Sequence, residues 1–245
     1  MKKKFLKTLG VLMMGIFLSN AYILKTGANT MNETDILTPR QQSIARIAAL
    51  TATGDMPKLN EALNNGLDVG LSVNEIKEVL VQMYAYAGFP RSLNGLGAFQ
   101  NVLNERHARG ITDKMGEAGK ELPQGTDKFA YGNTMQINLT GRPVAGGIMD
   151  FAPAIDAFLK EHLFADIFGR GVLSYQDREV ATIAALSAMT GVQSQLGSHI
   201  QIGMNTGLSE AEITQIITLV KQHVGTSQAA AATEVLNKIK KGKQK

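Results

Sequence analysis

Few side chains in this sequence are suited to acid–base or nucleophilic chemistry. The 245 residues include no cysteine, which excludes both thiolate nucleophiles and disulfide bonds. The four histidines are far apart in the sequence, and none forms the H-x-x-x-H pattern that places two imidazoles on one helix face. We therefore predict no bound metal. Among the histidines, His199 is the candidate to supply a proton near neutral pH.

These candidate side chains lie within a sequence repeat. Residues 37–50 read LTPRQQSIARIAAL, and residues 173–186 read LSYQDREVATIAAL. A second match relates residues 66–76 to residues 203–213 after a shift of one position. The chain therefore carries two copies of one supersecondary unit, each of about 75 residues.

Each copy has the sequence pattern of several helices. The segment 38–41 offers a threonine cap, a proline at the first helical position and a glutamine as capping partner. Ser72-x-x-Glu75 and Ser209-x-x-Glu212 are capping boxes at the start of a later helix. Apolar residues then recur at helical spacing, and no segment resembles a run of alternating strands. The sequence predicts an all-α fold.

Composition and repeats divide the chain into five segments. They are a signal peptide (1–21), a linker (22–36), a first module (37–115), a connector (116–165) and a second module (166–245). Residues 116–149 are rich in glycine and polar residues and show no sustained helical period. We therefore interpret this stretch as irregular, followed by one helix at about 151–164.

The N-terminus has the pattern of an export signal. Four lysines within the first seven residues precede an apolar run from Leu9 to Leu18, and Ser19-Asn20-Ala21 offers a cleavage site. We predict cleavage after Ala21 and a periplasmic location. The apolar run is shorter than the roughly 20 residues that span a bilayer, so we expect no membrane association after cleavage.

The charge pattern argues against a nucleic-acid partner. The formal net charge of +4 is largely a property of the predicted signal peptide, which holds four lysines and no acidic residue. The mature chain is therefore close to neutral. The remaining basic cluster, at 238–245, has no interleaved aromatic residues and is typical of a solvated helix end.

Several motifs resemble those of the γ-carboxymuconolactone decarboxylase family and its alkylhydroperoxidase D-like relatives. They are Arg178-Glu179, Ser198-His199 followed by Gly203, the turn at 207–213, the stretch at 78–90 and the segment DFAPAIDAFLKEHLF. The resemblance implies two tandem helical modules of this type. It also implies a homo-oligomer, and we expect a trimer of two-module chains.

The redox branch of this family carries a C-x-x-C pair just before the histidine. In this sequence the two places hold Val192 and Gln195, and their counterparts in the first module hold Asp55 and Lys58. Peroxidase or peroxiredoxin activity is therefore only an inherited family label, because the required thiolate is missing.

The decarboxylase branch works without metal or organic cofactor. Loss of CO2 from a carboxylated lactone leaves negative charge that cationic or hydrogen-bonding groups must stabilise, and a carbon atom that must be protonated. The resemblance thus implies a small carboxylated substrate and a lyase or lactone-handling reaction. His199 would donate the proton, Glu179 would orient the imidazole, and Arg178 or Arg91 would bind a carboxylate.

The two modules have diverged in opposite directions. The second keeps Arg178, Glu179 and His199, and the first has Gln42, Ser43 and Ala62 instead. The first keeps Tyr84, Tyr86 and Arg91, and the second has Lys221, His223 and Gln228. We therefore predict one composite pocket to which both modules contribute. Tyr84 and Tyr86 cannot share a helix face, and Tyr86 is preferred because its counterpart His223 is polar.

Two alternatives stay open from the sequence. His199 can be a structural histidine, and Arg178 with Glu179 can be an ordinary surface ion pair in the first turns of a helix. The protein would then be a non-catalytic periplasmic oligomer that binds a small ligand. Export also argues against intracellular aromatic-ring catabolism, so the sequence leaves the substrate undefined.

Overall fold

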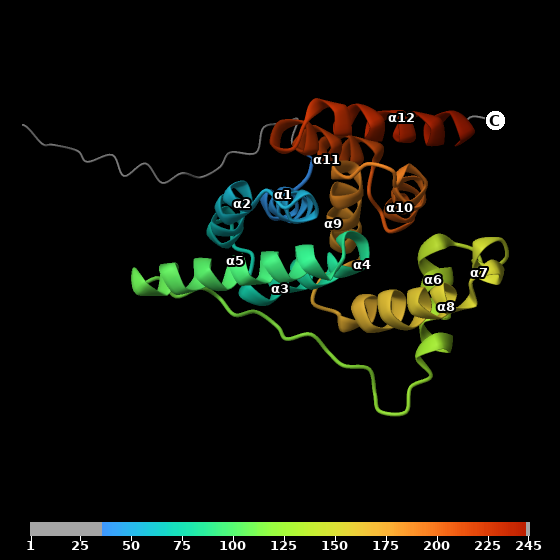
Figure 1. Ribbon diagram of the computed structural model, residues 1–245, viewed down its shortest axis with the longest axis horizontal. Helices are drawn as coiled ribbons and strands as arrows, with labels where there is room; N and C mark the ends of the chain where they lie inside the picture. The colour runs from blue at the N-terminus through green and yellow to red at the C-terminus, as the bar shows by residue number, and fades with distance from the viewer. Residues whose placement is uncertain (1–35, 244–245) are drawn as a thin grey trace, which may run out of the picture. The chain divides into compact units, whose positions relative to one another are not determined.

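The computed structural model describes residues 36–243, and within this range every regular element is a helix (Figure 1). This confirms the all-α prediction. The predicted signal peptide, its cleavage after Ala21 and nearly all of the predicted linker lie outside the described residues. No helix in the described range combines the length and the apolar character needed to cross a membrane.

The first module is built from five helices. They are α1 (Pro39–Thr53), α2 (Met56–Asp68), α3 (Val73–Gln82), α4 (Tyr84–Ala87) and α5 (Phe89–Ala108). The predicted caps form: Thr38 and Gln41 make a capping box at α1, and Ser72 and Glu75 make another at α3. Local side-chain chemistry therefore decides where these helices begin.

The second module repeats the order of the long helices. They are α9 (Tyr175–Ala188), α10 (Gln193–Asn205), α11 (Glu210–His223) and α12 (Thr226–Lys243). Ser174 caps α9, and Ser209 forms the predicted capping box of α11 with Glu212. The two modules thus share both their helix order and their capping signals.

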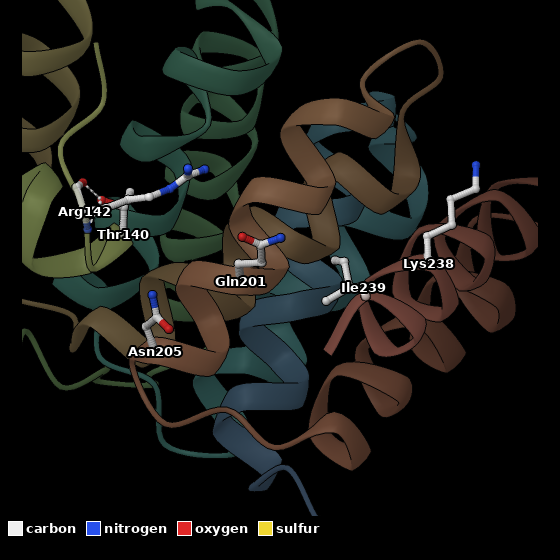
Figure 2. Close-up of a pocket in the computed structure, with 7 residues that line it drawn as sticks. Thr140, Arg142, Gln201, Asn205, Lys238 and Ile239 are labelled. Atoms are coloured by element: carbon white, nitrogen blue, oxygen red, sulfur yellow. Dashed lines mark hydrogen bonds between the residues drawn. The ribbon is translucent and has the colours of Figure 1, made fainter. Parts of the chain in front are cut away.

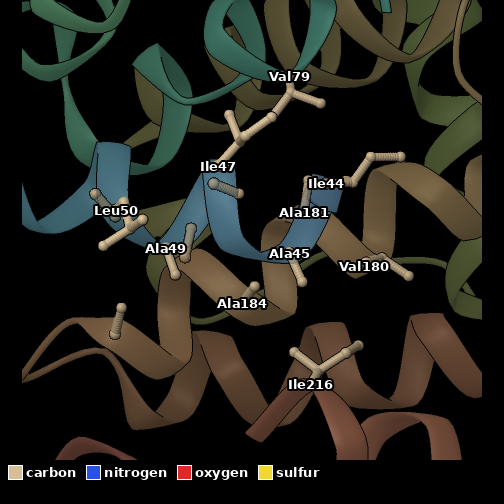
Figure 3. Close-up of a cluster of buried hydrophobic side chains, with 14 of the residues drawn as sticks. Ile44, Ala45, Ile47, Ala49, Leu50, Val79, Val180, Ala181, Ala184 and Ile216 are labelled. Carbon is tan, nitrogen blue, oxygen red and sulfur yellow. The ribbon is translucent and has the colours of Figure 1, made fainter. Parts of the chain in front are cut away.

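The two modules pack on each other through α1 and α9, the most extensive helix pair in the described chain. Figure 3 shows Ala45 and Ala49 of α1 beside Ala181 and Ala184 of α9, with Ile216 of α11 below them. Small side chains at the crossing let the two helices approach closely. One hydrophobic core therefore runs through both modules, within a single compact unit.

The connector differs from the prediction. It contains α6 (Lys128–Thr140), α7 (Ile148–Phe151), α8 (Pro153–Phe158) and most of the π-helix η1 (Leu159–Ile167). The end of η1 and the 3-10 turn η2 (Phe168–Arg170) fall within the predicted second module. The irregular interpretation of 116–149 was wrong for α6. Its Gly132 is needed for close packing, since an added Cβ would lie 1.8 Å from the backbone oxygen of Lys160. The helix predicted at 151–164 continues instead to residue 170.

The connector packs on the second module through its own small apolar cluster. The buried members are Leu139 of α6, Leu163, Phe164 and Ile167 of η1, Phe168 of η2, and Ile202 of α10. The side chain of Asn205 adds a hydrogen bond of 3.0 Å to the carbonyl oxygen of Leu139. As a result, α6 packs against α10, the helix that carries His199, and η1 packs against α6 and contributes to the same apolar cluster as Ile202 of α10.

Candidate functional site

The site centres on a buried carboxylate–imidazole pair. Glu179 of α9 and His199 of α10 lie on neighbouring helices, and Glu179 Oε2 is 2.9 Å from His199 Nδ1. The Glu179 side chain is fully buried, and His199 is 8% exposed. The alternative of a surface ion pair is therefore wrong for Glu179. The hydrogen bond orients the imidazole and leaves Nε2 as the nitrogen that can exchange a proton with a ligand.

Apart from its contact with His199, the carboxylate of Glu179 has few hydrogen bonds to the described part of the protein. Its second oxygen, Oε1, is buried and has no hydrogen-bond partner among the described residues. A buried carboxylate at this distance stabilises an imidazolium formed during proton transfer. The pair can therefore hold and release a proton at a defined position.

His199 lines a cavity of about 300 Å³ between α10, α6 and η1. One wall is apolar and comes mainly from Met149, Leu159, Leu163, Phe164 and Ile202. The polar groups are Gln136, Thr140, Arg142, Ser194, Gln195, Ser198 and Gln201. No described carboxylate belongs to this lining. A volume of this size lies at the lower end of the range for small-molecule pockets, roughly 300–1,000 Å³.

A second, more open cavity of about 610 Å³ adjoins the first. Figure 2 shows Thr140 and Arg142 on the connector side, Gln201 and Asn205 on α10, and Lys238 and Ile239 on α12. Thr140, Arg142 and Gln201 line both cavities. These three residues therefore mark the mouth through which the His199 cavity meets the open one.

Tyr86 is the residue of the first module that reaches His199. The centroids of the two rings are 5.2 Å apart in an edge-to-face arrangement. The Tyr86 hydroxyl is buried near Thr182, but no hydrogen bond of standard geometry reaches it. Burial, together with the charge of Glu179, raises the pKa of Tyr86 well above its ordinary value. The ring thus supports the imidazole from the first module, and its hydroxyl stays protonated.

Tyr84 and Arg91, the other two residues of the first module that were predicted for the composite pocket, contact other groups within the described chain. Tyr84 stacks on Phe89 with ring centroids 4.6 Å apart, and Arg91 donates a hydrogen bond of 2.7 Å to the carbonyl oxygen of Thr53. Arg91 lies in the first turn of α5, and its hydrogen bond satisfies a carbonyl oxygen at the C-terminal end of α1. Neither side chain lines the cavity.

Arg178, which was predicted to bind substrate, lies in a buried network with the first module. Its side chain is 0% exposed, and it contacts the first module through Glu78 Oε2 at 3.2 Å and Gln82 Oε1 at 2.9 Å. Glu78 also accepts a hydrogen bond of 2.7 Å from Arg170. Burial lowers the pKa of Arg178, and Glu78 opposes this shift. Arg178 therefore ties α9 to α3, and it is not among the residues that line the cavity.

The sequence interpretation missed Gln136 and Arg142. Gln136 lies in α6 and Arg142 lies just after its C-terminal end. The sequence analysis did not predict α6, because the surrounding residues are rich in glycine. Asp127 caps α6 and Gly141 ends it in the left-handed conformation at φ 74°. This pairing of an N-terminal Asp cap with a C-terminal glycine is a signal that could have revealed the helix.

A comparison with models of protein families gives a match over most of the chain. The model of the family described as "Carboxymuconolactone decarboxylase family" matches residues 20–101 and 153–238. The search of curated proteins finds no match to this chain. The two matched segments agree with the tandem repeat, and together they cover more than half of the chain. Gln136, Arg142 and the whole of α6 lie between them.

Proposed function

Since the chain belongs to the carboxymuconolactone decarboxylase family, we propose that it is a cofactor-free enzyme of this decarboxylase type. Its substrate would be a small carboxylated molecule bound beside His199. The observation that carries the proposal is the His199–Glu179 pair, with a 2.9 Å contact, at the wall of a small cavity. A purely structural histidine would not need a ligand-sized space beside it.

The proposed reaction uses the imidazole as the proton donor. The bond between the carboxyl carbon and its neighbour breaks, CO2 leaves, and the electron pair is delocalised onto an adjacent carbonyl group. His199 Nε2 then gives its proton to the carbon atom and becomes neutral. Glu179 holds Nδ1 and stabilises the imidazolium before the transfer. A proton from solvent restores the pair through the open cavity.

The environment of the pair supports this chemistry. The apolar wall formed by Leu159, Leu163 and Phe164 limits water around the reacting carbon. The small volume restricts the substrate to a compact molecule. Tyr86 restrains the imidazole on its edge, so that the proton donor keeps one orientation.

The proposal also includes the export and the homo-oligomeric assembly predicted from the sequence. A periplasmic enzyme would act on a carboxylated molecule outside the cytoplasm, which argues against an intracellular ring-cleavage intermediate as the substrate. Cell fractionation and the mass of the purified mature protein in solution test these two points directly.

The reaction is tested by CO2 release from a panel of carboxylated lactones and 2-keto acids. We expect His199→Ala to reduce turnover by about 10²–10⁴-fold, which is the usual contribution of a positioned acid or base. Glu179→Gln should reduce it less, because the imidazole is retained. His162→Ala is the matched control, since His162 is exposed and pairs with Asp166 rather than lining the cavity.

Folding and assembly must be unchanged for this comparison to count. Circular dichroism and gel filtration of each variant provide that check. If the wild type shows no turnover on the panel, and His199→Ala binds ligands as the wild type does, the non-catalytic ligand-binding alternative replaces the decarboxylase proposal.

A further inference from the structure

The charge of the cavity selects the kind of ligand that it can hold. Arg142 is the one permanently charged side chain among the described residues lining the His199 cavity, and no described Asp or Glu joins it there. The adjoining open cavity adds Lys238 and again no described acid. A ligand that enters through this mouth therefore meets positive charge, which favours an anion.

Arg142 is also the arginine whose guanidinium makes no hydrogen bond or ion pair with residues 36–243. Each of the other arginines in the described range donates at least one side-chain hydrogen bond to the protein. The guanidinium of Arg142 makes no such bond and no ion pair with a described residue, and the side chain is exposed. Its planar set of donors is therefore available to a carboxylate.

The backbone around Arg142 is held in place, although its side chain is not. The Thr140 hydroxyl donates a hydrogen bond of 2.6 Å to the Arg142 carbonyl oxygen (Figure 2). Gly141 makes the left-handed turn that ends α6, and Asn205 of α10 binds the Leu139 carbonyl oxygen. These contacts hold residue 142 at the mouth, between the two cavities.

Gln136 provides a second, independent sign of a ligand. It is 4% exposed, it lines the His199 cavity, and its Oε1 atom has no hydrogen-bond partner among the described residues. A buried amide without a partner is unfavourable unless a ligand or water satisfies it. Gln136 is therefore placed to bind a polar group of a molecule that occupies the cavity.

We infer that Arg142 binds the carboxylate of the ligand at the mouth of the cavity and that Gln136 orients the ligand inside it. The inference rests on the proposed function for the site, but it concerns binding and replaces the roles predicted for Arg178 and Arg91. Both residues come from a segment outside the family match. Ligand selectivity would then depend on the connector, whereas the proton donor belongs to the family module.

Benzoate and benzamide are suitable probes, because they have the same apolar ring and only benzoate carries a charge. The full mature chain is titrated with each by calorimetry or NMR. We expect the wild type to bind benzoate more tightly than benzamide. Arg142→Gln should weaken benzoate binding at least tenfold and leave benzamide unchanged, whereas Gln136→Leu should weaken both. Arg109→Gln is the matched control and should bind both probes as the wild type does, because Arg109 is exposed and lines neither cavity.

A chemical experiment checks the same point without measuring affinity. Phenylglyoxal should modify the unpaired Arg142 readily, and benzoate should protect it in the wild type. Equal benzoate affinity in Arg142→Gln and the wild type would overturn the inference. So would a wild type that does not bind benzoate, or that binds benzamide equally well.

These outcomes separate the inference from the proposed reaction. If no substrate is turned over but benzoate binding depends on Arg142, the inference holds and the decarboxylase proposal fails. If turnover depends on His199 while Arg142→Gln leaves KM and benzoate affinity unchanged, the inference fails and the reaction stands.

Discussion

The two modules use the same packing devices but differ in their interior chemistry. An added Cβ at Gly203 would lie 2.9 Å from Ile183, and one at Gly66 would lie 3.1 Å from Ile47, the repeat counterpart of Ile183. Both modules also form a Ser–Glu capping box at the same helix. The scaffold therefore depends on caps and close contacts that the two copies have in common.

The polar pair is present in only one of these equivalent interiors. Glu179 and His199 correspond to Ser43 and Ala62, which are also buried, at 1% and 6% exposure. The helices pack without a charged pair in the first module, so the fold does not require one. Burial of a charged pair adds little stability compared with apolar residues. The comparison teaches that the same helix packing forms without a Glu–His pair, which supports the role proposed above for Glu179 and His199.

The surroundings of the two interiors differ as well. In the second module, α6 and η1 cover α10 and enclose the cavity. In the first module, α2 packs on α1 and α5, and Lys58 of α2 donates a hydrogen bond of 3.1 Å to the carbonyl oxygen of His223 in α11. The helix pairs α1–α2 and α9–α10 are similar, and the connector forms a cavity of ligand size beside α10.

The largest expected effect is a difference in the free energy of unfolding between substitutions at equivalent positions of α1 and α9, the first long helix of each module. Arg178→Met should reduce the free energy of unfolding by about 3 kcal/mol, because it leaves the buried carboxylate of Glu78 with a single partner, Arg170. Gln42→Met should reduce it by less than about 1 kcal/mol, since Gln42 is half-buried and loses one hydrogen bond to the Leu37 carbonyl oxygen. Urea unfolding at neutral pH measures both. Equal losses would show that Arg178 does not hold the modules together.

A smaller effect tests whether the connector makes the site. Gly132→Ala places a methyl group against the Lys160 backbone, which should cost about 1–3 kcal/mol through overpacking. By displacing η1 it should also weaken benzoate binding several-fold. Gly97→Ala is the control, because an added Cβ there meets no atom within 4 Å. Unchanged benzoate affinity in Gly132→Ala would separate the site from the connector.

The smallest effect concerns His223, the counterpart of Tyr86. Burial lowers the pKa of His223, and Arg46 and Lys58 lower it further. The unfolded chain then binds a proton at a higher pH than the folded chain does. Stability from this residue is present above its unfolded pKa, near 6.5, and is lost as the pH falls toward the lower folded value.

His223→Gln should therefore flatten the decline of stability between about pH 7 and pH 5. The difference should be below about 1 kcal/mol, because His223 is only half-buried and solvent screens its neighbours. It should persist in about 1 M salt, since burial rather than charge is the main cause. Thermal unfolding at a series of pH values measures the slope, and identical slopes in the variant and the wild type would contradict this assignment.

The helices were predictable from the sequence because their signals are local. Caps such as Thr38 with Gln41 act over three residues, and the repeat then doubled the evidence for each element. The exception was α6, where Gly132 suggested an irregular chain. Gly132 allows α6 to pack against the backbone of Lys160, a contact between residues far apart in the sequence. Local patterns do not report such contacts.

The sequence by itself determined the helical repeat, the absence of cysteine chemistry and the choice of Glu179 and His199, whose contact joins two consecutive helices. Only the tertiary structure decided which charged groups accompany them. Arg178 and Arg91 satisfy other parts of the protein, whereas Arg142 is left at the mouth of the cavity. The physical reason is that a cation's role depends on whether packing supplies it with a partner, and that depends on residues distant in the chain.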